Sequence, residues 1–418
     1  MPDLPTLRNC AGCMACVDAC PVGALSLEWG RDGFPFVVLD RRKCVSCGKC
    51  ERACPVLRKE LHADNQMAKG ESLCMAWAKD PGIREASSSG GIATALGLRV
   101  LRAGGLVAGA RIEGTSVRHV LAETEDELRK LQGTKYMWSD ARGIYRQVLD
   151  CLEAGRPVMF GGTPCQTAAL VGRVPEKNRH LLLAVDLICH GVPSRRIWEL
   201  FSRSRSSPPE CVLSFRDKQD GWRHPFALTF RDSARQTHRL AGAANTYSRM
   251  FLHDLALRPL CYRCPFAGLH RVSDLTVGDG WGCEGCPDEE KGVSLVVCRS
   301  ERGLRALQEV AVTRGIDRFH KILAKNPPLF GFRSPIRFHP GRLFLMHSLG
   351  CSRKTLEKIL ANRFRGDFAW MARGFPFLAA TFVLNPIRAF LLKRSIRAIA
   401  SMLERRRGAQ REKEESDG

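Results

Sequence analysis

Two runs of closely spaced cysteines near the N-terminus constrain this chain more than any other feature of its sequence. The first is Cys10-x-x-Cys13-x-x-Cys16-x-x-x-Cys20-Pro21, and the same spacing returns between Cys44 and Pro55. Cysteines three positions apart on a tight loop can converge on one [4Fe–4S] cube, while the fourth reaches the other cube. The spacing therefore predicts two iron–sulfur clusters within residues 1–57. One cube is then held by Cys10, Cys13, Cys16 and Cys54, and the other by Cys20, Cys44, Cys47 and Cys50.

Structural zinc is the competing interpretation of this segment, because zinc sites also use C-x-x-C pairs. Zinc sites do not use two tandem runs of four cysteines. Small residues also fill the two loops, as backbone N–H···S bonds to a cluster require. These residues are Ala11, Gly12, Ala15, Ser46 and Gly48. The segment resembles a two-cluster ferredoxin domain, which is a small α+β fold.

The chain has 19 cysteines in 418 residues, a number that also occurs in secreted disulfide scaffolds. Its first residues show no basic segment followed by an apolar run, so no signal peptide is expected. Reduced thiols at clustered spacings are typical of metal ligands in the cytoplasm. We therefore expect a cytoplasmic protein.

A larger domain is predicted after the cysteine-rich module. Residues 58–72 are polar and are expected to form a linker to a core over residues 73–300. In this core, the apolar run at 158–160 leads into GGTPCQTAAL, and the run at 181–188 leads into CHGVPS. Strand-like runs that alternate with helical patterns predict an α/β core whose functional groups lie where strands end.

One loop of small residues, Ser87-Ser88-Ser89-Gly90-Gly91, precedes the apolar run at 92–101. Backbone N–H groups without bulky side chains at the start of a helix can bind a phosphate or pyrophosphate. A Ser/Gly loop that only caps a helix has the same composition, so both interpretations stand.

Seven short motifs occur in order along the core: SSSGGIATAL (87–96), GGTPCQTAAL (161–170), DLICHGVPS (186–194), SFRDKQDGW (214–222), CYRCPF (261–266), SDLTVGDGWG (273–282) and KGVSLV (291–296). Together they resemble the β-subunit family of coenzyme F420 hydrogenases and dehydrogenases, in the form with a fused N-terminal ferredoxin domain. The resemblance covers about residues 10–300. It implies a flavin-binding core with bound FAD, a further [4Fe–4S] cluster near it, and hydride transfer at the flavin.

The resemblance also gives candidate site residues. The candidate flavin contacts are Ser89, Gly90, Gly91, Thr94, Thr163 and Gln166. Lys218 and Asp279 are candidates for the flavin or substrate pocket. His190 is a candidate proton donor, and a hydrogen-bonded structural histidine is the alternative.

The further cluster needs four thiolates, and the family motifs contain Cys165, Cys189, Cys261 and Cys264. Spacing alone allows another grouping, in which Cys261 and Cys264 join Cys283 and Cys286 in a zinc ribbon. We favour the cluster, because a flavin needs a nearby one-electron donor. The cysteines in apolar surroundings are expected to be small core residues; they are Cys74, Cys151, Cys211, Cys298 and Cys351.

After residue 300 the sequence becomes basic and helical. The chain has a net charge of +22, and more than half of it lies in residues 331–407. We expect a basic helical region over 301–407 that covers the core, and a disordered tail over 408–418. Peripheral attachment to the inner face of an anionic membrane is an alternative. No motif supports nucleic-acid binding.

Two functions remain open. The first is an FAD-dependent iron–sulfur oxidoreductase that passes electrons between the ferredoxin clusters and FAD, with hydride transfer to or from an organic substrate. That substrate is coenzyme F420 or another acceptor, for example one in surface-polysaccharide metabolism. The second is a non-catalytic subunit that delivers electrons to a partner enzyme. Both require an external donor or acceptor such as ferredoxin, F420 or a partner subunit. Flavin motifs on the same chain favour the enzyme.

Overall fold

The computed structural model describes residues 2–316 except 7, 31, 224–225, 253 and 255–256, together with residues 322, 325 and 326. The predicted tail at 408–418, the basic helices and membrane-attachment segment after residue 326, and Cys351 lie outside these residues. No helix in the described part is both long enough and apolar enough to cross a membrane.

The N-terminal module consists of two short helices and a β-hairpin. Its elements are α1 (Ala15–Ala19), β1 (Leu25–Trp29), β2 (Pro35–Leu39) and α2 (Lys49–Arg52). The two cysteine runs have the same backbone at matching positions. Gly12 and Ser46 both have positive φ, as do Met14 and Gly48. The repeat in the sequence is therefore also a repeat in the structure.

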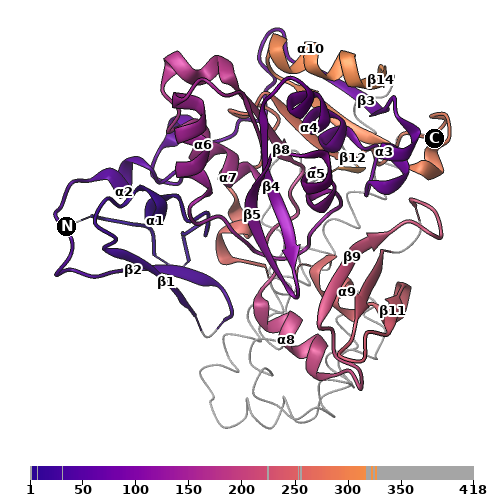
Figure 1. Cartoon of the computed structure of the whole chain (residues 1–418), viewed down its shortest axis with the longest axis horizontal. Coiled ribbons are helices and arrows are strands. Elements are labelled where there is room, and N and C mark those ends of the chain that lie inside the picture. The colour runs from indigo at the N-terminus through magenta and orange to yellow at the C-terminus, as the bar shows by residue number, and fades with distance from the viewer. Residues whose placement is uncertain are drawn as a thin grey trace, which may run out of the picture. The chain divides into compact units, whose positions relative to one another are not determined.

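The core is built on one large mixed sheet of nine strands in the order β14-β3-β13-β12-β8-β7-β4-β5-β6 (Figure 1). The neighbours β12, β8, β7 and β4 run parallel, whereas β13, β3 and β14 pair antiparallel at one end. The strands are β3 (Ser72–Ala78), β4 (Leu106–Glu113), β5 (Ser116–Ala122), β6 (Ser139–Asp140), β7 (Val158–Gly162), β8 (Leu182–Leu187), β12 (Leu275–Asp279), β13 (Ser294–Cys298) and β14 (Ala311–Arg314).

Helices cover both faces of this sheet (Figure 1). Met159 and Leu183 point into one apolar layer, and their neighbours Val158 and Phe160 point into the other. Strands buried on both faces have continuous apolar sequences, as β7 and β8 do. The first layer contains α4 (Ile92–Arg102), α5 (Glu125–Leu131) and α10 (Glu301–Val310). The second contains α6 (Ile144–Glu153) and α7 (Pro164–Val171).

The sheet continues past the boundary predicted at residue 300. Helix α10 packs on the first layer, and β14 then pairs with β3 at the edge of the sheet. The remaining elements are α3 (Pro81–Ala86) and a smaller antiparallel sheet with two helices. These are α8 (Arg195–Arg203), β9 (Cys211–Asp217), β10 (Ala227–Arg231), β11 (Thr237–Leu240) and α9 (Thr246–Leu252).

The N-terminal module packs against the second layer. Cys13 and Ala15 belong to the same buried cluster as residues of α6 and α7. The segment predicted as a linker also contacts the core, since the amide of Ala63 donates to the carbonyl oxygen of Pro265 at 2.8 Å. Module and core therefore share an apolar interior.

Candidate functional site

The carboxyl ends of the parallel strands meet at one edge of the large sheet. Strand β7 ends at Gly162, β8 at Leu187 and β12 at Asp279. Ligands in open α/β sheets bind at this edge. The candidate residues Thr163, Cys165, Cys189, His190 and Asp279 all lie at or just after these strand ends.

The first thiol group consists of Cys10, Cys13, Cys16 and Cys54. Burial raises the pKa of the Cys16 thiol to about 12, and the nearby Cys10 and Cys54 contribute to this rise. Burial also raises the pKa of Cys54, with smaller contributions from Cys10 and Cys50. The amide of Gly12 donates to the Cys10 sulfur at 3.3 Å, which is the N–H···S bond expected around a cluster.

The second thiol group consists of Cys20, Cys44, Cys47 and Cys50, which line one hollow of the N-terminal module. The amide of Ala24 donates to the Cys20 sulfur at 3.2 Å. In the described part of the chain, no three metal-binding side chains converge closely enough for a single metal ion. The thiolates of a four-iron cube bind separate irons, so they need not converge on one point as the ligands of a single ion do.

The third thiol group consists of Cys165, Cys189, Cys261 and Cys264. Cys165 lies in the first turn of α7, Cys189 follows β8, and the other two belong to or follow a 3₁₀ turn over Pro259–Arg263. Burial raises the pKa of Cys189 far above its usual value, and Cys261, Cys165 and Cys264 add to this rise. The four candidate thiols are therefore neighbours in space, although they come from three separate segments.

The first and third thiol groups are adjacent. Ala11, which lies between Cys10 and Cys13, belongs to a buried cluster against which Cys165 and Cys264 pack. In line with this packing, burial raises the pKa of Cys13 and Cys165 adds to the rise. Cys13 belongs to the N-terminal module and Cys165 to the core. The two groups thus meet across the boundary between module and core.

Cys283 and Cys286 lie in a different environment. Their exposed fractions are 4% and 7%, and they pack with Trp222 and Leu295. Burial and the neighbouring Cys286 raise the pKa of Cys283 to about 12. Cys264, in contrast, packs in a cluster with Cys165. The structure separates the two pairs that the zinc-ribbon alternative would join.

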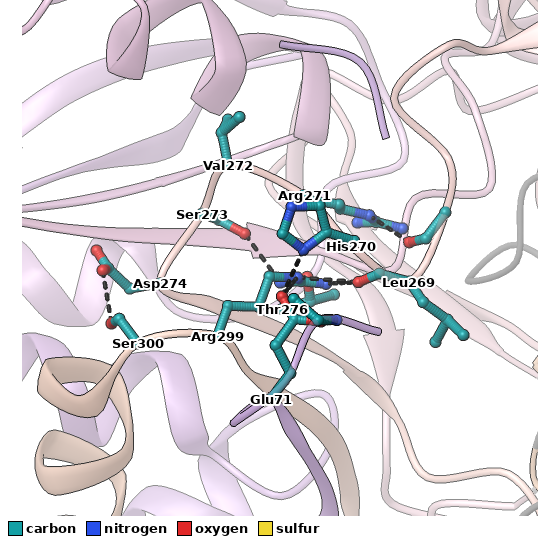
Figure 2. A network of polar contacts seen from close by, with 12 residues as sticks. Glu71, Leu269, His270, Arg271, Val272, Ser273, Asp274, Thr276, Arg299 and Ser300 are labelled. Carbon is teal, nitrogen blue, oxygen red and sulfur yellow. Dashed lines mark hydrogen bonds and ion pairs between the residues drawn. The ribbon is translucent and has the colours of Figure 1, made fainter. Parts of the chain in front are cut away.

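A buried polar network fixes the segments that carry the third thiol group (Figure 2). Arg271 donates to Asp186 at 3.1 Å and to the carbonyl oxygens of Gly268 and Leu187, which links the Cys264 segment to the end of β8. Arg299 donates to Ser273 and Thr276. Burial lowers the pKa of Arg299 to about 10, while the Asp186 carboxylate opposes this change.

Asp274 belongs to the same region and supports the backbone. It accepts hydrogen bonds from the amide of Ala184 at 2.8 Å and from the Ser300 hydroxyl at 2.7 Å. These contacts tie β8 to the start of α10.

The Ser-Gly loop packs tightly on β13. The Ser89 hydroxyl donates to the carbonyl oxygen of Val293, and the amide of Gly90 donates to the Ser294 hydroxyl. A Cβ atom on Gly90 would lie 2.5 Å from the carbonyl oxygen of Ala76, so the loop requires glycine there. Packing against β13 and β3 therefore shapes this loop.

Helix α4 follows the loop and has no side-chain cap among the described residues. The amides of Ile92, Ala93 and Thr94 form its first turn and have no acceptor within the helix. Lys218 lies beside this helix start, where its ammonium donates to the carbonyl oxygens of Ser89 and Arg84. Burial, Arg216 and Arg84 lower the pKa of Lys218 to about 8. The ammonium also donates to the carbonyl oxygen of Lys291, so its three hydrogen bonds all go to backbone carbonyl oxygens. The amides at the start of α4 are the part of this arrangement that fits an anionic group.

Thr163 and Gln166 form a capping box at the start of α7. The Gln166 amide oxygen accepts from both the backbone amide and the hydroxyl of Thr163, at 3.0 and 2.9 Å. These residues shape the turn that carries Cys165.

The two predicted flavin segments are the turn at residues 163–166 after β7 and the Ser-Gly loop on β13. Three strand spacings separate β7 from β13, so these segments lie about 14 Å apart along the sheet edge.

The catalytic candidates all have partners. His190 lies 2.7 Å from the Asp254 carboxylate and next to the ring of Phe251. Asp279 pairs with the buried Arg216 at 2.5 Å. The structure therefore places Lys218 beside the Ser-Gly loop and Asp279 in an ion pair, while His190 lies next to the third thiol group.

Three core residues outside the predicted site bind the first cysteine loop. Arg258, Trp138 and Tyr145 each donate to one backbone carbonyl oxygen in this loop. Only Arg258 had a signal in the sequence, since it lies three residues before Cys261.

Family profiles match most of the described chain. One profile describes the C terminus of the beta subunit of coenzyme F420 hydrogenase/dehydrogenase and matches residues 155–320, and the profile of the N-terminal part of the same protein matches residues 73–144. A 4Fe-4S dicluster domain profile matches residues 9–57. No curated protein matches the chain in sequence.

Solved structures also match part of the chain, among them one from a hydrogenase complex. It is a chain from the xenon-derivatised F420-reducing [NiFe] hydrogenase complex of Methanosarcina barkeri, which is 18% identical, with 64% of this chain and 91% of that chain covered and a TM-score of 0.41.

Proposed function

Since the chain belongs to the coenzyme F420 hydrogenase/dehydrogenase beta-subunit family and carries a 4Fe-4S dicluster domain, we propose that it is an iron–sulfur flavoprotein oxidoreductase of the cytoplasm. The N-terminal module exchanges single electrons with an external donor or acceptor, such as a ferredoxin or a partner subunit. Two-electron chemistry on an organic substrate, F420 or another acceptor, takes place at the carboxyl edge of the large sheet.

One observation supports this proposal: Ala11, in the loop between Cys10 and Cys13, packs in one buried cluster with Cys165 of the third thiol group. We assign the third group to a further [4Fe–4S] cluster that receives electrons from the N-terminal module. Electron transfer over short steps needs such a chain of adjacent carriers. Cys165 shares its turn with Thr163 and Gln166, so this cluster would lie directly beside one of the two predicted flavin segments.

The start of α4 is the proposed anchor for the flavin. The amides around Gly91 and Thr94 would bind a phosphate group, and Lys218 holds the preceding loop through the Ser89 carbonyl oxygen. A bound FAD would supply the exchange between single electrons and hydride that iron–sulfur clusters cannot perform. His190, whose Nε2 lies 2.7 Å from the Asp254 carboxylate, would hold or release the proton that accompanies hydride transfer.

The visible spectrum of the anaerobically purified full chain tests this function. We expect resolved flavin bands above a broad cluster absorption, and about one FAD per chain released by acid. Cluster absorption without flavin, even after incubation with FAD, would overturn the enzyme and favour a subunit that only relays electrons.

A further inference from the structure

Arg258 is a fully buried cation at the boundary between module and core. Its exposed fraction is 0%. Its guanidinium donates to the carbonyl oxygen of Cys10 at 3.2 Å and to that of Pro35 at 2.7 Å, and it lies over the ring of Phe34. All three contacts are with the N-terminal module, whereas Arg258 itself belongs to the segment that leads into Cys261.

In the described part of the chain, no Asp or Glu forms an ion pair with this guanidinium within 4.0 Å, and its Nε has no hydrogen-bond partner. Two of the three other buried arginines in the described chain have such a partner: Arg216 pairs with Asp279 at 2.5 Å, and Arg271 with Asp186 at 3.1 Å. The third, Arg84, donates three hydrogen bonds to backbone carbonyl oxygens instead. Burial of a charge without a counter-charge is costly, so a negative group is expected near Arg258.

The two nearest candidates for that negative group are the first and third thiol groups. A Cβ atom on Gly12 would lie 2.4 Å from the Arg258 Nη2, so the guanidinium packs directly on the loop between Cys10 and Cys13. On the core side, the carbonyl oxygen of Arg258 accepts a hydrogen bond of 2.8 Å from the amide of Cys261, a member of the third group. Arg258 therefore lies between the two groups of thiols.

We propose that Arg258 is the internal counter-charge of the two iron–sulfur clusters held by the first and third thiol groups, and that it raises their reduction potentials. A cluster with four thiolate ligands carries net negative charge, and reduction adds one more. A buried cation nearby stabilises the reduced state more than the oxidised state, because low local dielectric strengthens their attraction. Arg258 is thus a positioning residue for electron transfer. The part that concerns the third group rests on the proposed function.

A redox titration of the full chain, in which electron paramagnetic resonance detects the reduced clusters, tests this role. In Arg258→Gln, we expect the ratio of reduced to oxidised cluster at a fixed potential to fall about tenfold. This fall corresponds to a reduction potential that is lower by about 59 mV for a one-electron couple. Iron content should remain that of the wild type. The matched control is Arg263→Gln, since Arg263 is exposed and donates to Asn9 at the surface of the same boundary.

Arg258→Lys separates charge from hydrogen bonding. The lysine keeps the positive charge but loses the planar fork, so its cluster potentials should lie closer to the wild type than to Arg258→Gln. Potentials in Arg258→Gln equal to those of the wild type, at full iron content, overturn the proposal. If the clusters do not assemble in Arg258→Gln, the Arg258→Lys variant tests the role instead. Full iron content with reduction potentials near those of the wild type supports the role. Loss of the clusters from both variants overturns it.

Failure of the proposed function and failure of the Arg258 proposal give different results. Should the wild type hold only the two clusters of the N-terminal module, the third-cluster assignment fails. The potential of the cluster at Cys10, Cys13, Cys16 and Cys54 still tests Arg258 in that case.

Discussion

The hydroxyl of Tyr145, in the first turn of α6, donates a 2.7 Å hydrogen bond to the carbonyl oxygen of Cys13. Two further core residues bind the same loop: Trp138 donates to the carbonyl oxygen of Gly12, and Arg258 to that of Cys10. The core thus holds three carbonyl groups of the first cysteine loop. An independent electron carrier on a flexible tether would not need these contacts, so the N-terminal module is a fixed part of the molecule.

Asp18 provides a second fixed contact between module and core. Its carboxylate accepts hydrogen bonds of 2.7 Å from the amides of Gly143 and Arg146 and thereby caps α6, which has no side-chain cap of its own. Asp18→Ala should lower the free energy of unfolding by about 2 kcal/mol, because it removes a buried cap and leaves two amides without acceptors. The urea midpoint measures this change. Glu28→Ala, an exposed change in the same module, should have little effect; equal midpoints for both variants would contradict the cap.

The two cysteine pairs of the core should differ in iron content. Cys261→Ser/Cys264→Ser should lose about four irons per chain, the content of one cube. Cys283→Ser/Cys286→Ser should retain all iron, since this pair packs in a separate apolar cluster. Iron and zinc analysis of both double variants distinguishes the cases. Loss of zinc from both variants would instead support the zinc-ribbon alternative.

The burial of His119 in its neutral form should make the stability of the fold decrease in mild acid. Burial lowers its pKa to about 4, and its ring contacts the Ser139 hydroxyl and the Gly161 carbonyl oxygen. An unfolded histidine titrates near 6.5, so between pH 6.5 and 4 the unfolded state binds more protons and stability rises with pH. From pH 7.5 to 5.5 we expect a loss of about 1 kcal/mol.

Urea unfolding at both pH values measures this loss. His119→Gln should lose less stability than the wild type over the same range, whereas the exposed change His180→Gln should behave like the wild type. An identical pH dependence in all three proteins would show that His119 is not the group responsible.

Lys218 should make flavin binding depend on pH. Its pKa of about 8 means that the ammonium loses its proton between pH 7 and 9. The neutral amine holds the Ser89 carbonyl oxygen less strongly and no longer attracts an anion. FAD affinity should therefore fall roughly fivefold over this range, as expected for about 1 kcal/mol.

Fluorescence titration with FAD follows this affinity. Lys218→Met should bind FAD more weakly at pH 7 and show no such fall toward pH 9. Lys291→Met is the matched control, because the exposed Lys291 side chain contacts Asp288 rather than the loop. A fall of equal size in Lys218→Met would assign the pH dependence to another group.

Local patterns in the sequence predicted several elements. The apolar runs at 158–160 and 181–188 are β7 and β8, and the run at 92–101 is α4. The cysteine spacing predicted the N-terminal module because ligands of one cube come from neighbouring positions on one loop. In each case the information lies within a few consecutive residues.

Contacts between distant segments could not be predicted in the same way. Asp18 and Gly143 are 125 positions apart, and Arg258 and Cys10 are 248 apart. Spacing also left the partners of Cys261 open, since a second C-x-x-C pair follows closely in sequence. Only the packing of β7 and β8 beside this segment brings Cys165 and Cys189 to it.

The rate at which a reduced ferredoxin reduces the bound flavin tests the proposed electron path most directly. Anaerobic rapid mixing can follow cluster and flavin absorbance separately in the intact chain and in Cys261→Ser/Cys264→Ser. We predict that the clusters of the N-terminal module are reduced equally fast in both, while flavin reduction in the variant slows by roughly a hundredfold or more. Flavin reduction at the same rate in both proteins would contradict a path through the third thiol group.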